Sequence, residues 1–224
     1  MKKRWQETCR FAGVPSYLLP YADHVYDSLI ASQYSEPHRR YHTLEHIKHC
    51  FAELLGCRTS STSFGSYNNQ KLLPAVEMAI WFHDIHYNIN EPKQELASSK
   101  VCIDRCIRME ISAVGHEAET MIKMSDHVPY WDSAAINEAE KVFLDIDLSI
   151  LGQDSYDYSI YEAQIRAEYK RVPDEIFYSK RKEILRGFLE RPSIYYTDFF
   201  KNKYEEQAQF NLIRTVAKIE NANR

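Results

Sequence analysis

Glycine, proline and long apolar runs are scarce in this sequence of 224 residues, which contains six glycines and eight prolines. So few chain-breaking residues exclude collagen-like and low-complexity proteins. The densest apolar stretch, residues 72–82, is short and is interrupted by Pro74 and Glu77, so the sequence predicts no membrane-spanning segment. The positive charges of residues 2–4 are not followed by an apolar segment, and we therefore expect no secretory signal and a cytoplasmic location.

Cysteine pairs and an excess of positive charge are also lacking. The five cysteines are odd in number and contain no CxxC pair. This pattern indicates reduced thiols, buried or incidental, rather than a disulfide framework or a thiolate-rich metal site. The net charge is -4, from 28 basic and 32 acidic residues. Such a chain has no overall attraction for a polyanion, which excludes general nucleic-acid binding.

The apolar residues of the sequence recur with helical periodicity, and no segment alternates convincingly like a strand. The pattern predicts a single all-α domain over residues 1–224, with a core of about residues 20–152 and C-terminal helices, 153–224, packed on it. Helix stops are expected at Gly56 and Gly152, and breaks at Pro173 and Pro192. The expected helices cover residues 43–55, 72–87, 90–109 with Asn90 as N-cap, 114–123 and 133–151, and a polar loop is expected at 58–70.

Histidines and aspartates are concentrated in three segments. His42 and His46 are four residues apart on a predicted helix, a spacing that places both rings on one face. His83 and Asp84 lie side by side in the most apolar predicted helix, where a charge is costly unless it is paired or bound to a metal. Asp147 is one of two aspartates that interrupt a third apolar run. Two imidazoles and two carboxylates would suit a divalent cation and leave coordination positions open, which defines a ligand cluster of His46, His83, Asp84 and Asp147.

The order His, His-Asp, Asp on separate helices resembles that of the HD superfamily of metal-dependent phosphohydrolases. Segment 41–46 (YHTLEH) resembles the Y-H-x-x-x-H signature of the cyclic-nucleotide phosphodiesterase branch, and segment 146–149 (IDLS) resembles the aspartate segment of the superfamily. Over nearly its full length, the chain is similar to compact bacterial proteins described as predicted HD-type phosphohydrolases, including at residues 166–169 and 205–211. The resemblance implies an HD-domain-like helical bundle and phosphoester hydrolysis, and it implies no substrate.

The resemblance also implies roles for individual residues. The ligand cluster would hold one or two divalent ions (Mn, Mg, Zn, Ni, Co or Fe), and a water activated by the metal would attack the phosphorus. His42 would donate a proton to the leaving oxygen. The expected catalytic residues are therefore His42, Asp84 and His86.

Several residues have expected roles beside the cluster. His86 and His127 are candidates for a second metal or for substrate contact, because HD proteins with additional metal ligands keep histidines in these regions. Arg39 and Arg40, directly before the signature, are expected to orient phosphate by forked hydrogen bonds. The expected partner is a small phosphorylated substrate, a nucleotide by analogy, and the oligomeric state is left open.

Two alternatives remain open at this point. HD proteins with a histidine-rich di-iron centre are oxygenases, and His86, His116 and His127 are candidate extra ligands for such a centre. The other alternative is an HD protein that binds a nucleotide without turnover and keeps the ion for stability. The identity of the bound metal and the presence or absence of turnover distinguish the hydrolase, the oxygenase and the nucleotide-binding protein.

Overall fold

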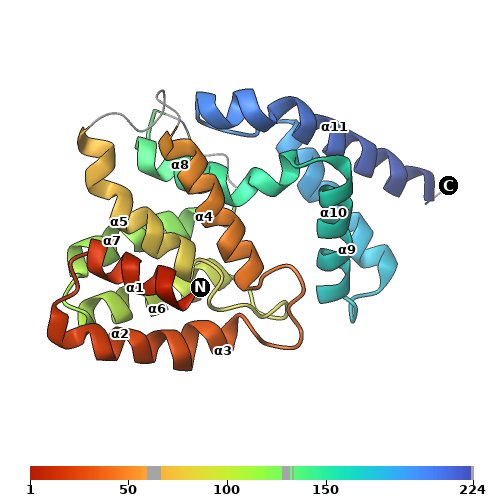
Figure 1. Ribbon diagram of the computed structural model, residues 1–224. Helices are drawn as coiled ribbons and strands as arrows, with labels where there is room; N and C mark the ends of the chain where they lie inside the picture. The colour runs from red at the N-terminus through yellow and green to blue at the C-terminus, as the bar shows by residue number, and fades with distance from the viewer. Residues whose placement is uncertain (60–66, 128–131, 133, 223–224) are drawn as a thin grey trace.

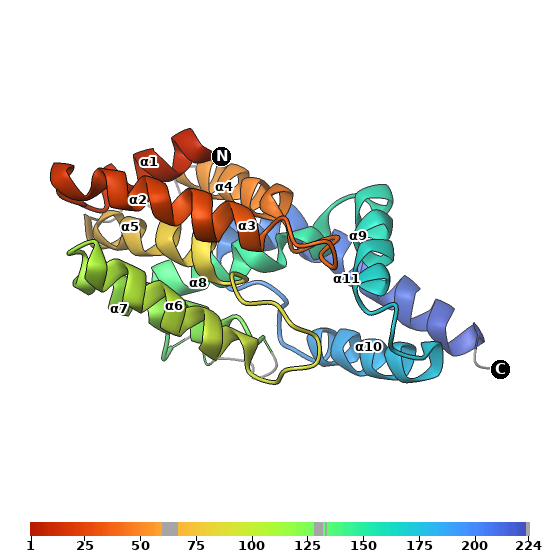
Figure 2. The same cartoon turned by 90° about the horizontal axis from the view of Figure 1, so that it is seen from below.

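The computed structural model describes residues 1–59, 67–127, 132 and 134–222, and within them it contains helices and no strand. The all-α prediction is therefore confirmed. Helices α1 to α8 form a bundle, and α9, α10 and the C-terminal part of α11 lie at one end of it (Figures 1 and 2). None of the described helices combines the length and apolar character that crossing a membrane requires.

The helices in chain order are α1 (Lys2–Phe11), η1 (Ser16–Leu18), α2 (Leu19–Val25), the π-helical η2 (Tyr26–Ile30), α3 (Ala31–Gln33), α4 (Leu44–Thr59), α5 (Tyr67–Phe82), α6 (Gln94–Arg108), α7 (Ser112–Met124), α8 (Glu138–Leu148), η3 (Ser149–Gly152), α9 (Ser155–Glu168), α10 (Asp174–Leu189) and α11 (Asp198–Ala222).

The predicted helices are all found, but several of their ends differ from the prediction. α4 continues through Gly56, because one glycine inside a helix costs only about 1 kcal/mol. α6 begins after Lys93 rather than at Asn90, since the backbone of Lys93 is left-handed, with φ of 61°. α8 begins after Asn137, whose side chain accepts two helix N–H groups in a capping box. The predicted loop at 58–70 lies largely outside the described residues.

The end of α5 has the greatest consequence for the site. α5 stops at Phe82, five residues before the predicted end. The N–H of His83 still donates to the carbonyl of Ala79 (2.9 Å), but the N–H of Ile85 donates to that of Phe82 (3.1 Å), so the chain turns tightly. Neighbouring side chains within a helix diverge by about 100°. In this turn His83 and Asp84 are released from that constraint and converge.

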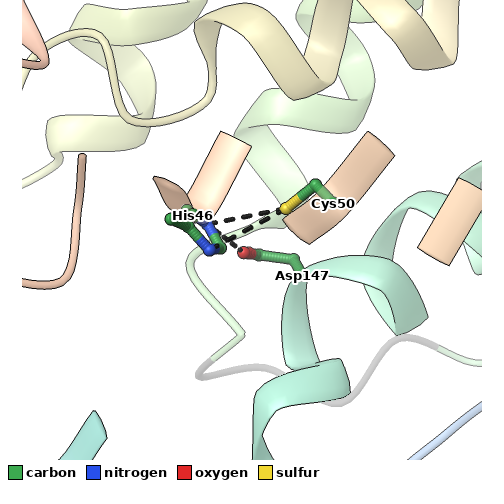
Figure 3. Close-up of side chains that lie close together, drawn as sticks. All are labelled: His46, Cys50 and Asp147. Carbon is green, nitrogen blue, oxygen red and sulfur yellow. Dashed lines mark hydrogen bonds and ion pairs between the residues drawn. The ribbon is translucent and has the colours of Figure 1, made fainter. Parts of the chain in front are cut away.

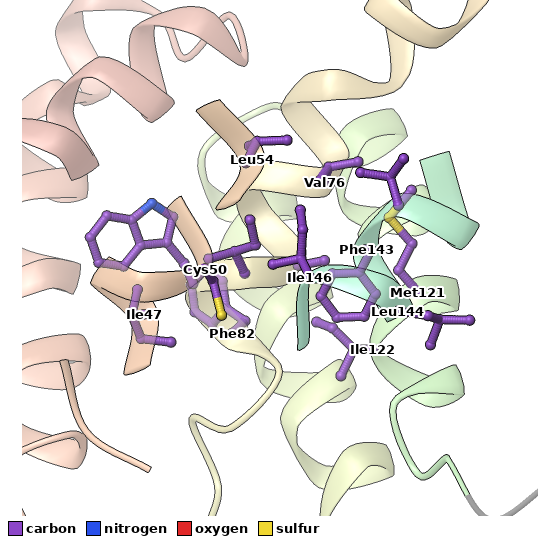
Figure 4. Close-up of a cluster of buried hydrophobic side chains, with 14 of the residues drawn as sticks. Ile47, Cys50, Leu54, Val76, Phe82, Met121, Ile122, Phe143, Leu144 and Ile146 are labelled. Carbon is purple, nitrogen blue, oxygen red and sulfur yellow. The ribbon is translucent and has the colours of Figure 1, made fainter. Parts of the chain in front are cut away.

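The core is built around α5, as its apolar sequence predicts. Val76 to Phe82, apart from Glu77, are fully buried, and Figure 4 shows Val76 and Phe82 among side chains from α4, α7 and α8. The buried side chains also include residues of α1. Trp5 of α1 is buried, with its ring edge-on to Trp81 at 5.6 Å. The five cysteines are free and buried, as predicted.

The C-terminal helices are tied to α8 and η3 by buried hydrogen bonds. The carboxylate of Asp145 accepts the N–H of Tyr196 (2.7 Å), the N–H of Thr197 (2.8 Å) and the hydroxyl of Thr197 (2.7 Å). The hydroxyl of Tyr195 donates to the carbonyl of Leu148 (3.1 Å). Asp145 therefore holds the segment that leads into α11, and it leaves Asp147, two residues later, to the ligand cluster.

Gly152 allows η3 to approach α11 closely, and Gly152→Ala is expected to lower the free energy of unfolding by about 1 to 3 kcal/mol. A Cβ atom on Gly152 would lie 2.4 Å from the Cβ of Tyr204 and 2.8 Å from its carbonyl oxygen. Gly187, inside α10, has nothing within 4 Å of such an atom. Gly187→Ala is the matched control and is expected to stabilise the protein by about 0.5 to 1 kcal/mol. Urea unfolding followed by circular dichroism measures both, and equal stabilities would contradict this packing.

Candidate metal centre

Three distant segments bring the ligand cluster together. His46 comes from α4, His83 and Asp84 from the turn after α5, and Asp147 from α8. Figure 3 shows the side chains of His46 and Asp147 pointing toward one another. The Nε2 atoms of His46 and His83 are 3.0 Å apart, and Oδ1 of Asp147 lies 3.3 Å from the first and 3.4 Å from the second. Oδ2 of Asp84 lies 3.6 Å and 2.9 Å from the same two nitrogens.

These separations are those of atoms that share one cation. A divalent ion bonded at about 2.1 Å to nitrogen or oxygen separates neighbouring ligand atoms by about 3.0 to 3.4 Å. The tautomer of His83 also suits a ligand, since its Nδ1 lies 3.0 Å from the carbonyl oxygen of Ile80 and donates to it. In the neutral imidazole the lone pair of Nε2 is then free, and a metal ion would take the place of the Nε2 proton. His46, His83 and Asp84 therefore lie close enough together to hold one divalent ion, and Oδ1 of Asp147 is within 3.4 Å of both imidazole nitrogens.

Charge in the cluster favours a cation at the same point. Burial opposes protonation of His83, but Asp84 and Asp147 outweigh it and raise the pKa of His83 well above its usual value. Burial likewise opposes ionisation of Asp147, but His83 and His127 hold the pKa of that carboxyl well below its usual range. Both carboxylates thus remain ionised. The two carboxylates attract positive charge to the Nε2 atoms of the histidines, and a metal ion would supply that charge.

Cys50 lies beside the cluster, one helical turn after His46, and the sequence assigned it no role there. His46, Cys50 and Asp147 are close enough to hold an ion (Figure 3). The sulfur is 3.8 Å from Nδ1 and 3.7 Å from Nε2 of His46. Because it is almost equidistant from both nitrogens, it lies away from the lone-pair direction of Nε2. Its position among core side chains such as Ile47 and Phe82 (Figure 4) also suits packing.

His42 is held by Glu168, a residue to which the sequence assigned no individual role. Nδ1 of His42 is 2.7 Å from Oε2 of Glu168, and the hydroxyl of Tyr87 donates to the same oxygen (2.7 Å). Oε1 accepts the backbone N–H groups of Arg40, Tyr41 and His42, at 2.6, 2.8 and 3.1 Å. One buried carboxylate therefore shapes the loop before α4 and orients the imidazole. The only signal in the sequence was that segment 166–169 matches the HD pattern.

The pKa values of His42 and Glu168 are shifted in opposite directions, and both shifts favour the charged forms. Burial favours the neutral acid, but the hydrogen bond and charge of His42, with the N–H of Arg40, lower the pKa of Glu168 to about 2. Burial also disfavours protonated His42, yet Asp84 and Glu168 raise its pKa above the usual value. The pair therefore stays an imidazolium held by a carboxylate to a higher pH than an ordinary histidine would. With Nδ1 taken up by Glu168, the proton that His42 can give away is on Nε2.

His127 lies at the edge of the cluster. Its Nε2 is 2.8 Å from Oδ2 of Asp147, the oxygen that does not face His46. The residue has a left-handed backbone, with φ of 53°, and its carbonyl accepts a hydrogen bond from Arg191. His127 therefore orients Asp147, and it is placed where a second ion would share that carboxylate.

The structure corrects the expected phosphate-binding role of Arg39 and Arg40. The side chain of Arg39 is fully buried and donates to the carbonyls of His42, Asp84 and Ile85 and to Glu36. Arg39 therefore links the segment before α4 to the turn after α5, and its N–H groups are hydrogen-bonded to these segments. Arg40 is exposed and donates to the carbonyls of Pro37 and Arg39. Neither side chain faces the ligand cluster.

His86 is not brought to the ligand cluster either, which corrects its expected role as a catalytic or second-metal residue. Its side chain is 36% exposed and its Nε2 is 2.9 Å from Glu91. It lines a separate cavity with His38, Lys170 and Arg171. His116 is a surface residue on α7, 67% exposed. Of the three extra ligands that a di-iron oxygenase would recruit, only His127 lies beside the cluster.

A cavity of about 380 Å³ opens over the ligand cluster. His42, His83, Asp84, His127 and Asp147 line its floor, and side chains of α9 and α10 form one wall. Its size is that of a small-molecule site. The basic side chains at this cavity are Lys180 and Arg181 of α10, which the sequence did not single out because they are far from the histidine motifs in the chain.

A candidate divalent-metal centre therefore lies beside a cavity that is also lined by His42, a histidine with a raised pKa. No family model, curated protein or solved structure matches the chain. The resemblance to HD-type phosphohydrolases therefore rests on the motifs of the sequence alone.

Proposed function

We propose that this protein is a metal-dependent phosphohydrolase that acts on a small phosphate ester. One observation carries the proposal: donor atoms from three separate segments lie 2.9 to 3.6 Å apart, and three of the four residues, His83, Asp84 and Asp147, line a cavity. Two imidazoles with two carboxylates would leave two positions open on a six-coordinate ion, as a catalytic metal site requires. The nearby imidazolium of His42 supplies an acid that a purely structural ion would not need.

Each residue has a defined part in the proposed reaction. His46, His83, Asp84 and Asp147 would hold the ion, which supplies Lewis-acid polarisation of a phosphoryl oxygen and a water of lowered pKa. His42 donates its Nε2 proton to the departing ester oxygen. Glu168 keeps that imidazole charged and oriented, and Tyr87 and the backbone of residues 40–42 fix Glu168 in turn.

A metal-reconstitution assay tests the proposed function. The protein is stripped with a chelator, reloaded separately with Mn, Mg, Zn, Ni, Co or Fe, and assayed for phosphate release from mono- and diesters, including nucleotides. We expect release that depends on the metal. If no metal supports release from any ester, the proposal is wrong, and iron-dependent oxygen uptake without phosphate release would favour the oxygenase alternative.

Metal binding is expected to raise the melting temperature of the chelator-treated protein. An ion at about 100 times its Kd stabilises the folded state by about 2.7 kcal/mol, which corresponds to about 5 to 11 °C for a chain of this size. Differential scanning calorimetry with and without metal measures the shift. The variant Asp84→Asn should lose most of it, whereas His116→Ala, at an exposed position, should keep it. A shift that survives Asp84→Asn would place the ion elsewhere.

A further inference from the structure

One face of α10 presents apolar side chains to the cavity above the ligand cluster. Ile176, Lys180, Ile184 and Phe188 follow one another at four-residue intervals and line the same cavity. Ile176 is 57% exposed and Ile184 46% exposed. Side chains of this size are costly to leave in water, and apolar surface inside a cavity is characteristic of a ligand site.

The cavity wall beyond Ile176 and Ile184 is also lined by apolar side chains. Ile165 of α9, Val172 of the loop after it and Phe177 of α10 line the same cavity. Apolar lining therefore extends along α9 and α10, at one end of the molecule in Figure 2, while the metal ligands come from α4, α8 and the turn after α5. A ligand that reaches both has one charged end and one apolar end.

The two basic side chains on this wall have partners within the protein. The guanidinium of Arg181 pairs with Glu162 and donates to the hydroxyl of Tyr161 (3.0 Å). The ammonium of Lys180 donates to Glu183 (2.8 Å). Reading the edges of a nucleobase or a sugar needs unpaired donors and acceptors, because polar ligand groups left without partners cost affinity. An aliphatic or aromatic group has no such need.

We infer that the substrate is a phosphomonoester of an apolar alcohol, with its alkyl or aryl group against the α10 stripe of Ile176, Ile184 and Phe188. The inference rests on the proposed phosphohydrolase function and names its substrate class. In the reaction the bond between phosphorus and the ester oxygen breaks, and the oxygen of water bonds to phosphorus. The leaving oxygen takes the proton of His42, which gives the free alcohol and inorganic phosphate.

A homologous series of ligands tests this inference through binding. Alkylphosphonates from methyl to octyl carry a phosphorus–carbon bond that is not hydrolysed, and calorimetric titration of the metal-loaded protein gives the Kd of each. Affinity is expected to rise about two- to fourfold for each methylene until the cavity is filled. Equal affinities along the series would overturn the inference, as would tight binding of nucleoside monophosphates with no binding of the alkyl series.

The variant Ile176→Ser/Ile184→Ser is the direct probe of the stripe. It is expected to reduce the gain per methylene to less than about 1.5-fold, because the added carbons then meet polar surface. Ile213→Ser is the matched control, since Ile213 is an isoleucine of α11 that is 58% exposed. It should keep the slope of the parent protein. An unchanged slope in the double variant would overturn the assignment of the stripe.

Hydrolysis of the matching alkyl phosphates separates failure of this inference from failure of the proposed function. If binding depends on chain length but no alkyl or other phosphate ester is hydrolysed, the phosphohydrolase proposal is wrong and the apolar ligand class is supported. If esters are hydrolysed with no dependence on chain length, the phosphohydrolase proposal is supported and the substrate class is wrong.

Discussion

The variant His83→Ala is expected to lose both metal binding and metal-dependent phosphate release. The Nε2 of His83 lies 3.0 Å from the Nε2 of His46 and 2.9 Å from Oδ2 of Asp84. The alanine variant therefore lacks the ligand atom that lies next to both of these residues. It also leaves Asp84 and Asp147 without the partner that lowers their pKa most. Loss of an outer partner of a metal ligand costs about 10- to 100-fold in affinity. For this direct ligand we expect a loss of more than about 100-fold.

The measurement is metal content by mass spectrometry after gel filtration, with calorimetric titration of the metal into the chelator-treated protein. His116→Ala is the matched control, because it removes an exposed imidazole from α7. It should bind one equivalent or more, as is expected of the parent. Stoichiometric binding by a folded His83→Ala variant, confirmed as folded by circular dichroism, would show that this cluster is not the metal centre.

The ligand cluster could be predicted because each of its parts leaves a local signal. His46 follows His42 at helical spacing, and the charges of Asp84 and Asp147 stand in apolar runs where an unpaired charge is costly. Burial of such groups therefore indicates that they converge on a partner. His86 stands in the same apolar segment as Asp84, yet its side chain is 36% exposed and lies beside Glu91, so the apolar run does not distinguish it from the ligands.

The residues that support the cluster could not be predicted in the same way. Glu168 lies 126 positions after His42 in the chain, and only the folded structure shows that its carboxylate meets three consecutive backbone N–H groups. Arg39 was assigned to phosphate because arginine forms forked hydrogen bonds. The same fork also suits carbonyl groups, and burial against Asp84 and Ile85 decided its partners.

Helix type was predictable from periodicity, whereas helix ends depended on tertiary contacts. The apolar pattern of α5 continues through Ile85 and Tyr87, both of which are buried, so periodicity placed the helix end too late. These side chains remain in the core although the backbone has already turned. The turn is the feature that lets His83 and Asp84 reach one ion, and hydrophobic spacing carries no information about it.

The variant Glu168→Gln is expected to shift the alkaline limb of the kcat/KM profile to lower pH. His42 must be protonated to act as an acid, and Glu168 is one of the three carboxylates that raise its pKa. Removing that charge lowers the pKa, so the imidazole loses its proton at a lower pH. Above the limb, kcat/KM should fall about tenfold for each pH unit of the shift. Glutamine keeps an oxygen that can accept the N–H groups of residues 40–42.

Tyr87→Phe separates the charge of Glu168 from its hydrogen bonds. The hydroxyl of Tyr87 donates to the same oxygen that pairs with His42, at 2.7 Å. Without it the carboxylate keeps its charge and its bonds to the backbone, so the alkaline limb should stay close to that of the parent. An equal shift in both variants would indicate a positioning effect alone, and an unshifted limb in Glu168→Gln would remove His42 as the proton donor. A shift in Glu168→Gln alone would identify the ionised carboxylate as the group that keeps His42 charged.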